Sequence, residues 1–198
     1  MKVLHVDSSI LGDASASRAL TGEIVRGLRA AQAHLEVSYL DLAAQPLPHY
    51  SAASLAPGEG AEGARDAAVL EEFLGADVIV IGAPLYNFSL PSQLKAWIDR
   101  ITIKGRTFRY TAQGPQGLAG GKRVIVAIAR GGVYAPGAGT EFAESYLKLL
   151  FNFLGITDLT FVRAEGLNLS PAEREQSLQS ARASIRDLSP GAPAALAA

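Results

Sequence analysis

Short apolar runs alternate along the chain with longer segments of helical periodicity. Four runs are rich in β-branched residues and apolar at nearly every position, and a weaker one alternates apolar and polar residues, so five strands are predicted. The predicted strands are Val3–Val6, Leu35–Leu40, Val78–Ile81, Val124–Ile128 and Leu159–Val162. The predicted amphipathic helices are Ala19–Leu28, Ala64–Leu74, Ser92–Ile101, Phe142–Leu154 and Pro171–Leu188. Ser170 suits the N-cap of the last helix, and Ser92 that of the third.

Strand and helix repeated five times predict the α/β class. Strands that are apolar on both faces are typical of a parallel sheet covered by helices on both sides. Five strands favour a doubly wound, flavodoxin-like order 2-1-3-4-5 over a six-stranded nucleotide-binding fold. We therefore expect one domain over residues 1–198, with the Ala/Pro-rich tail after about residue 190 frayed.

Two segments depart from the plain alternation. Ala43–Gly63 is rich in Pro, Ala, Ser and Gly and predicts a long loop of the kind that often borders a site. Lys104–Gly121 contains Thr107-Phe-Arg-Tyr110 followed by Gln-Gly-Pro-Gln-Gly. This pattern predicts a small hairpin inserted before the fourth strand.

Composition excludes several classes of protein. The 18 basic residues nearly balance the 19 acidic ones, so neither nucleic acid nor an anionic membrane has an electrostatic footprint. There is no cysteine, which excludes disulfides, thiol catalysis and Cys-ligated metals. The start lacks a signal peptide, and no apolar run approaches the roughly 18 residues of a membrane span. We expect a cytoplasmic protein by default.

A serine-rich turn follows the first strand. Ser8 and Ser9 end the strand, and Ser15 and Ser17 flank Ala16 at the start of the first helix. A helix N-terminus attracts phosphate through its unpaired N–H groups and partial positive charge, and serine hydroxyls add hydrogen bonds. Neither Gly-x-Gly-x-x-Gly nor a Walker-type Gly-Lys-Ser/Thr occurs here, which argues against a dinucleotide site and an NTPase. An ordinary N-cap explains the serines equally well.

An aromatic turn follows the third strand. It consists of Pro84, Leu85, Tyr86, Asn87 and Phe88. A flat heteroaromatic ring needs an apolar or aromatic wall and a few amide groups at its polar edge, which this turn offers. Core aromatics beside a proline-bounded turn are the alternative.

A glycine pair follows the fourth strand, in Ala129-Arg130-Gly131-Gly132 with Tyr134 just beyond. Paired glycines allow a backbone to approach a ligand closely or to make a tight turn. Ligands of open α/β sheets bind at the carboxyl ends of the strands. Because strands one, three and four are neighbours in the predicted order, we expect the three segments to line one crevice.

No side chain stands out as an acid, base or metal ligand. His5 lies inside the first strand and is expected in the core, whereas His49 lies in the long loop. The histidines lack metal-ligand spacing. Trp97 is expected to face the core, and Asp99 with Arg100 to form a helix-surface or interface pair.

Taken together and in this order, the segments closely resemble the FMN-dependent NADH:azoreductases, which belong with the NAD(P)H:quinone reductases of flavodoxin-like fold. The resemblance runs from Lys2 to about Gly166. Its most specific part is Pro-Leu-Tyr-Asn-Phe-Ser-Leu-Pro-Ser-Gln-Leu-Lys-Ala-Trp-Ile-Asp-Arg from Pro84, and it ends with Leu-Gly-Ile-Thr-Asp at 154–158.

The resemblance implies roles for the three segments. Ser9 and Ser15–Ser17 would hold the phosphate of FMN, Pro84–Phe88 would border the isoalloxazine, and Ala129–Gly132 would complete the polar edge of the ring. The family often has methionine where Leu85 stands and serine where Ala129 stands, which removes one hydroxyl contact to the flavin.

Further family features concern the subunit interface and the substrate. The resemblance implies a homodimer with one FMN per subunit near the interface. Tyr134, Phe153 from the partner chain, and Phe108 in the hairpin are the candidates for covering the substrate.

The activity implied is an NAD(P)H oxidoreductase that reduces quinones and cleaves the azo bond of aromatic azo compounds. NADH gives hydride to the flavin and leaves, and the acceptor then takes two electrons at the same place, twice for full azo cleavage. The flavin carries the chemistry, so no catalytic side chain is expected. Backbone N–H groups of Gly131 and Gly132 are candidates for stabilising the anion formed on reduction.

Two other classes stay open. A flavodoxin-type electron carrier would bind the same cofactor, but such carriers tend to be strongly acidic and this chain is nearly neutral. A non-catalytic interaction protein would keep the fold without flavin. No segment decides between NADH and NADPH.

Overall fold

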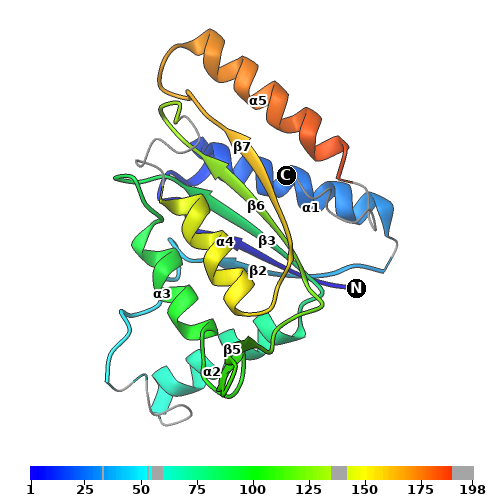
Figure 1. Cartoon of the computed structure of the whole chain (residues 1–198). Coiled ribbons are helices and arrows are strands. Elements are labelled where there is room, and N and C mark those ends of the chain that lie inside the picture. The colour runs from blue at the N-terminus through cyan, green and yellow to red at the C-terminus, as the bar shows by residue number, and fades with distance from the viewer. Residues whose placement is uncertain (33, 53, 55–59, 135–141, 189–198) are drawn as a thin grey trace.

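Five parallel strands form the central sheet, in the order β2-β1-β3-β6-β7 (Figure 1). The computed structural model describes residues 1–32, 34–52, 54, 60–134 and 142–188. The strands of the sheet are β1 (Lys2–Asp7), β2 (Glu36–Asp41), β3 (Val78–Pro84), β6 (Arg123–Ala129) and β7 (Asp158–Ala164). All five strands occur where the apolar runs place them. Counted along the chain, their order in the sheet is 2-1-3-4-5, so the predicted order is confirmed.

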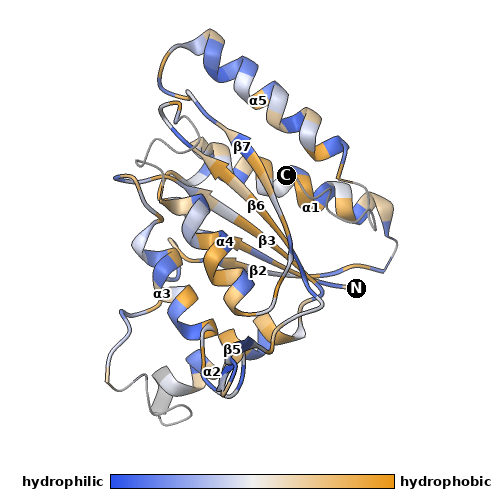
Figure 2. Ribbon diagram, in the orientation of Figure 1, coloured by the Kyte–Doolittle hydropathy of each residue, from blue (hydrophilic) through white to orange (hydrophobic). Residues whose placement is uncertain are grey.

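Helices cover both faces of this sheet. The helices are α1 (Ala16–Ala31), α2 (Gly60–Gly75), α3 (Ser92–Ile101), α4 (Ala143–Phe153) and α5 (Pro171–Arg186), with a short 3-10 turn η1 (Gly12–Ala14) before α1. One core lies between the sheet and α2, α3 and α4, and it includes the buried Phe73 and the predicted inward-facing Trp97. The second lies under α1 and α5. Strands β3 and β6 are apolar along most of their length (Figure 2), as burial on two sides requires.

The predicted hairpin is confirmed as β4 (Phe108–Thr111) and β5 (Gly114–Gly117), which pair antiparallel. The hairpin docks against the end of α4, where the Ala119 N–H donates to the Leu154 carbonyl at 2.9 Å. A Cβ on Gly117 would lie 2.1 Å from the backbone nitrogen of Gly155, so only glycine permits this approach.

Three expectations need correction. The loop predicted over Ala43–Gly63 ends earlier than expected, because α2 begins at Gly60. Residues 53 and 55–59 of this loop lie outside the described residues, and so does the tail from residue 189. Ser92 is not the N-cap of α3, since Pro91 occupies that position and no side chain caps the helix, whereas Ser170 does cap α5.

Asp99 and Arg100 do not form a pair at the surface. Arg100 is 2% exposed, because α2 packs over α3 and supplies Asp66 as its ion-pair partner. The Arg100 guanidinium also donates to the Ala96 carbonyl at 3.1 Å. Asp99 pairs instead with Lys95 at 2.6 Å, one helical turn earlier.

Gly82 in β3 provides a test of the close pairing with β1. A Cβ at Gly82 would lie 2.5 Å from Asp7 Oδ1, so we expect Gly82→Ala to lower the free energy of unfolding by about 1–3 kcal/mol. Gly22 in α1 is the matched control, because a Cβ there meets no atom within 4 Å and alanine is the better helix former by about 1 kcal/mol. Urea unfolding measures both, and a Gly82→Ala protein as stable as the wild type would contradict the crowding.

Candidate functional site

The three sequence-predicted segments meet at one edge of the sheet. They follow β1, β3 and β6, which pair side by side, so their carboxyl ends are neighbours. The Leu85 N–H donates to the Ala129 carbonyl at 2.8 Å. The hydroxyls of Ser9 and Tyr86 lie 3.1 Å apart. The serine turn, the aromatic turn and the glycine pair therefore form one continuous surface.

The serine turn is held closely against the start of α1. Its serines are buried, namely Ser9, Ser15 and Ser17. Ser15 is the N-cap of α1 and accepts the Arg18 N–H at 3.3 Å, while its hydroxyl lies 3.1 Å from that of Ser17. The N-cap interpretation is thus correct for Ser15. It does not exclude an anion site, because the first helical N–H groups have no partner inside the helix.

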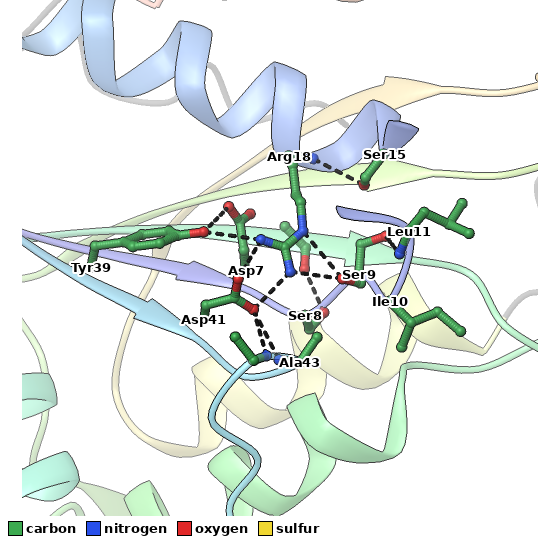
Figure 3. A network of polar contacts seen from close by, with 12 residues as sticks. Asp7, Ser8, Ser9, Ile10, Leu11, Ser15, Arg18, Tyr39, Asp41 and Ala43 are labelled. Atoms are coloured by element: carbon green, nitrogen blue, oxygen red, sulfur yellow. Dashed lines mark hydrogen bonds and ion pairs between the residues drawn. The ribbon is translucent and has the colours of Figure 1, made fainter. Parts of the chain in front are cut away.

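A polar network lies directly behind this turn (Figure 3). The guanidinium of Arg18 joins the Ser9 carbonyl at 2.8 Å to Asp41, the last residue of β2. Hydrogen bonds from Arg18 and the backbone hold the pKa of Asp41 at about 2, and Asp41 in turn raises the pKa of Arg18. Burial and the nearby carboxylates of Asp7 and Asp41 raise the pKa of Tyr39 to about 12.

Asp7 closes the network on the other side. Its carboxylate is 2% exposed and accepts from Thr21 at 2.9 Å and from the Tyr39 hydroxyl at 3.2 Å. The His5 ring is tilted against that of Tyr39, with centroids 4.8 Å apart, and its Nε2 lies 3.3 Å from Asp7. His5 lies mostly buried within β1, and His49 lies exposed in the long loop.

The aromatic turn is a tight and strained one. Tyr86 and Ser89 exchange backbone hydrogen bonds of 2.9 and 3.0 Å. The two residues between them adopt positive φ, 49° at Asn87 and 67° at Phe88, which asparagine tolerates but which is unfavourable for a bulky residue such as phenylalanine. Phe88 is 53% exposed, so it is not a core residue. Its ring lies edge-on to Tyr134, with centroids 6.4 Å apart.

The glycine pair packs against the segment after β7. The carbonyls of Gly131 and Gly132 accept from the N–H groups of Asn168 and Gly166 at 2.9 and 3.0 Å. A Cβ on Gly131 would lie 2.5 Å from Asn168 Nδ2. We expected these glycines to let the backbone approach a ligand or to make a tight turn. At Gly131, the group that comes close is the side chain of Asn168, which belongs to the protein itself.

The side chain of Arg130, directly before the glycine pair, is held by two carboxylates. It is 4% exposed and reaches Glu165 at 2.7 Å and Glu144 of α4 at 3.2 Å. Burial would raise the pKa of Glu144, but hydrogen bonds from Arg163 and Lys148 outweigh it and lower the pKa to about 2. Sequence reasoning noted Arg130 only as part of the motif, because its partners are distant in the chain.

The three candidates for covering the substrate do not lie together within one chain. Tyr134 lies beside Phe88 at the carboxyl edge. Phe108 and Phe153 pack on each other, with centroids 4.6 Å apart, at the opposite edge, where α4 ends and the hairpin docks (Figure 1). Helix α4 runs antiparallel to the strands, so its last residue points away from the site. Within one chain, neither phenylalanine therefore lies beside Tyr134.

The described part of the chain contains neither a metal site nor a membrane-spanning helix. No group of three or more His, Cys, Asp or Glu side chains in it is placed to hold a metal ion. None of its helices has the length and apolar content needed to cross a membrane.

Comparison with known proteins places this architecture in a class. A sequence model described as the flavodoxin-like fold matches residues 1–188, so the protein is flavodoxin-like. An FMN-dependent NADH:quinone oxidoreductase of Xanthomonas oryzae pv. oryzae is 56% identical over 186 residues, covering 94% of this chain and 95% of the relative. The chain therefore belongs to the family of the FMN-dependent NADH:quinone oxidoreductases.

Solved structures agree with this assignment. An azoreductase from Bacillus anthracis str. Sterne superposes with a TM-score of 0.83 at 30% identity, covering 95% of this chain and 98% of its own. An FMN-dependent NADH-azoreductase from Bacillus anthracis str. Ames Ancestor, solved in complex with FMN, gives 0.84 at 28% identity, with 96% and 99% covered.

Glu144 provides a test of the carboxylates that hold Arg130. Its pKa falls from an ordinary 4.5 to about 2 in the folded protein, so its contribution to stability is complete above pH 4.5 and is lost as the pH falls toward 2. We expect Glu144→Gln to cost about 2 kcal/mol near neutral pH and progressively less in acid.

Denaturant unfolding across this pH range measures the effect. Glu71→Gln is the control, because the Glu71–Arg106 pair is exposed and its loss should cost less than about 1 kcal/mol. A Glu144→Gln deficit of the same size at every pH would contradict the assignment.

Proposed function

We propose that this chain binds FMN at the carboxyl edge of its sheet and uses NADH to reduce quinones and aromatic azo compounds. The observation that carries the proposal is the hydrogen bond between Ser9 and Tyr86, 3.1 Å between hydroxyl oxygens. It joins a phosphate-type turn to an aromatic turn, so one ligand with a phosphate at one end and a flat ring at the other would span both. The activities for which the relatives are named supply the chemistry.

The residues at the start of α1 fit a phosphate. Ser15 and Ser17 place two hydroxyls 3.1 Å apart at the positive end of a helix of 16 residues, and Ser9 and Ala16 complete the turn. Hydroxyls and N–H groups donate to a dianion without introducing a buried lysine.

The remaining two segments fit the ring. Pro84–Phe88 would form its wall, and the backbone of Ala129–Gly132 its polar edge. Leu85 is tied to Ala129 at 2.8 Å, so the wall and the edge keep a fixed spacing. When bound, FMN supplies the hydride and electron chemistry; the protein binds and orients the reactants and excludes water.

A second subunit would complete the site. Several large apolar side chains near this edge are more than half exposed, namely Ile10, Leu11, Phe88 and Val133. We infer a homodimer that covers this surface, with Tyr134 in place beside the ring and Phe153 or Phe108 arriving from the partner. A single domain in the cytoplasm, without nucleic acid or membrane as partner, completes the proposal.

An absorption spectrum tests the proposal directly. The purified protein, or the apoprotein after reconstitution with FMN, should be yellow and should bleach when NADH is added without oxygen. Adding a quinone should then restore the colour. A yellow protein that does not respond to NADH would indicate an electron carrier, and a protein that cannot be loaded with FMN would exclude both flavin functions.

The phosphate turn has its own test. Ser15→Ala with Ser17→Ala should raise the dissociation constant of FMN by at least about tenfold, because two hydroxyl donors are lost at about 1 kcal/mol or more each. Ser170→Ala is the matched control, since it removes the same kind of N-cap from α5. Flavin fluorescence titration measures binding, and unaltered FMN affinity in the double variant would place the phosphate elsewhere.

A further inference from the structure

Arg18 is the one cation in direct contact with the backbone of the serine turn, among the contacts seen in the described chain. Its guanidinium donates to the Ser9 carbonyl from Nε at 3.1 Å and from Nη2 at 2.8 Å. It also grips both carboxylate oxygens of Asp41 at 2.7 Å and donates to the Tyr39 hydroxyl at 3.0 Å. A guanidinium has five N–H donors, and these five contacts use all of them.

Because all five N–H donors of Arg18 are in use, Arg18 can act on a ligand only indirectly. Its side chain is only 16% exposed, and a phosphate at the turn would find no remaining N–H on it to bind. Arg18 therefore cannot be a direct phosphate ligand without giving up a contact that the protein already makes. Its effect on a ligand must pass through the Ser9 carbonyl or through its charge.

The geometry of the peptide bond shows what holding this carbonyl does. The Ser9–Ile10 peptide is planar and trans, so the Ile10 N–H points opposite to the Ser9 carbonyl. Because Arg18 holds the carbonyl on one side, the N–H faces the other side, where it donates to the Tyr86 hydroxyl at 3.3 Å. Arg18 thus orients a backbone N–H, together with the Ser9 hydroxyl, toward Tyr86, where the serine and aromatic turns meet.

The support of Arg18 is itself fixed. Asp41 Oδ1 accepts from the N–H groups of Ala43 and Ala44 at 3.0 and 3.1 Å, so the carboxylate cannot rotate freely. The Tyr39 hydroxyl donates onward to the buried Asp7 at 3.2 Å. The guanidinium is therefore held from two strands, β1 and β2, while its own backbone belongs to α1.

We propose that Arg18, braced by Asp41, is the positioning residue that sets the FMN phosphate turn in its binding conformation, without touching the phosphate. This inference rests on the proposed function. It makes the Arg18–Asp41 pair a determinant of phosphate recognition, so it governs the preference for FMN over riboflavin, which has the same ring and no phosphate.

The closing experiment separates positioning from charge. Arg18→Lys keeps the positive charge but cannot reproduce a planar fork with five donors. We expect it to raise the dissociation constant of FMN by about tenfold, which corresponds to about 1.4 kcal/mol, and to leave that of riboflavin within about twofold of the wild-type value. Arg29→Lys is the matched control, because Arg29 lies exposed on the same helix, and it should alter neither.

Fluorescence titration of the apoproteins with each flavin gives these values, and thermal unfolding of each apoprotein checks the fold. Asp41→Asn provides a second variant that leaves Arg18 in place; it should weaken FMN in the same selective way. The inference is overturned if Arg18→Lys binds FMN as tightly as the wild type, or if FMN and riboflavin weaken equally. A wild type that binds FMN no better than riboflavin refutes the phosphate turn itself, and one that binds neither refutes the proposed function.

Discussion

Burial of β1, β3 and β6 between two helical layers is the constraint on which the rest of the structure depends. With helices on both faces, a parallel sheet has no exposed surface for chemistry except the edges where its strands end. At the carboxyl edge the chain must turn back, and the backbone groups of those turns need partners other than the ladder. The serine turn, the aromatic turn and the glycine pair are the three solutions found here.

Each turn is held by groups that lie behind it. Arg18 and Asp41 hold the serine turn, and Arg130 with Glu144 holds the glycine pair. In both cases an arginine is largely withdrawn from solvent and ion-paired with a carboxylate, which avoids the cost of an isolated buried charge. Such pairs add little net stability compared with apolar packing. Their value lies in fixed geometry, which suits a surface that must present donors at set positions.

The sequence was sufficient to predict the elements and their order, because the continuous apolar runs of the buried strands and the 3.6-residue period of the helices were clear. Contacts between side chains far apart in the chain were not predictable from one sequence. The pairing of Arg18 with Asp41 depends on the rotation of α1 against β2, and the burial of Arg100 depends on how α2 lies over α3. The contact of Phe108 with Phe153 was equally unpredictable, because a hairpin's position along the chain does not indicate the edge of the sheet at which it docks.

The aromatic turn keeps a backbone conformation that costs stability. Glycine would relieve the positive φ at Asn87 and Phe88, which costs little at Asn87 and on the order of 1 kcal/mol or more at Phe88. A glycine, however, would remove the amide and the exposed ring, and it would loosen the turn that carries Tyr86 to the serine turn. The turn's two hydrogen bonds between Tyr86 and Ser89 hold the strained form. Because Tyr86 also contacts Ser9, rigidity in this turn is passed on to the serine turn, so the two turns support each other.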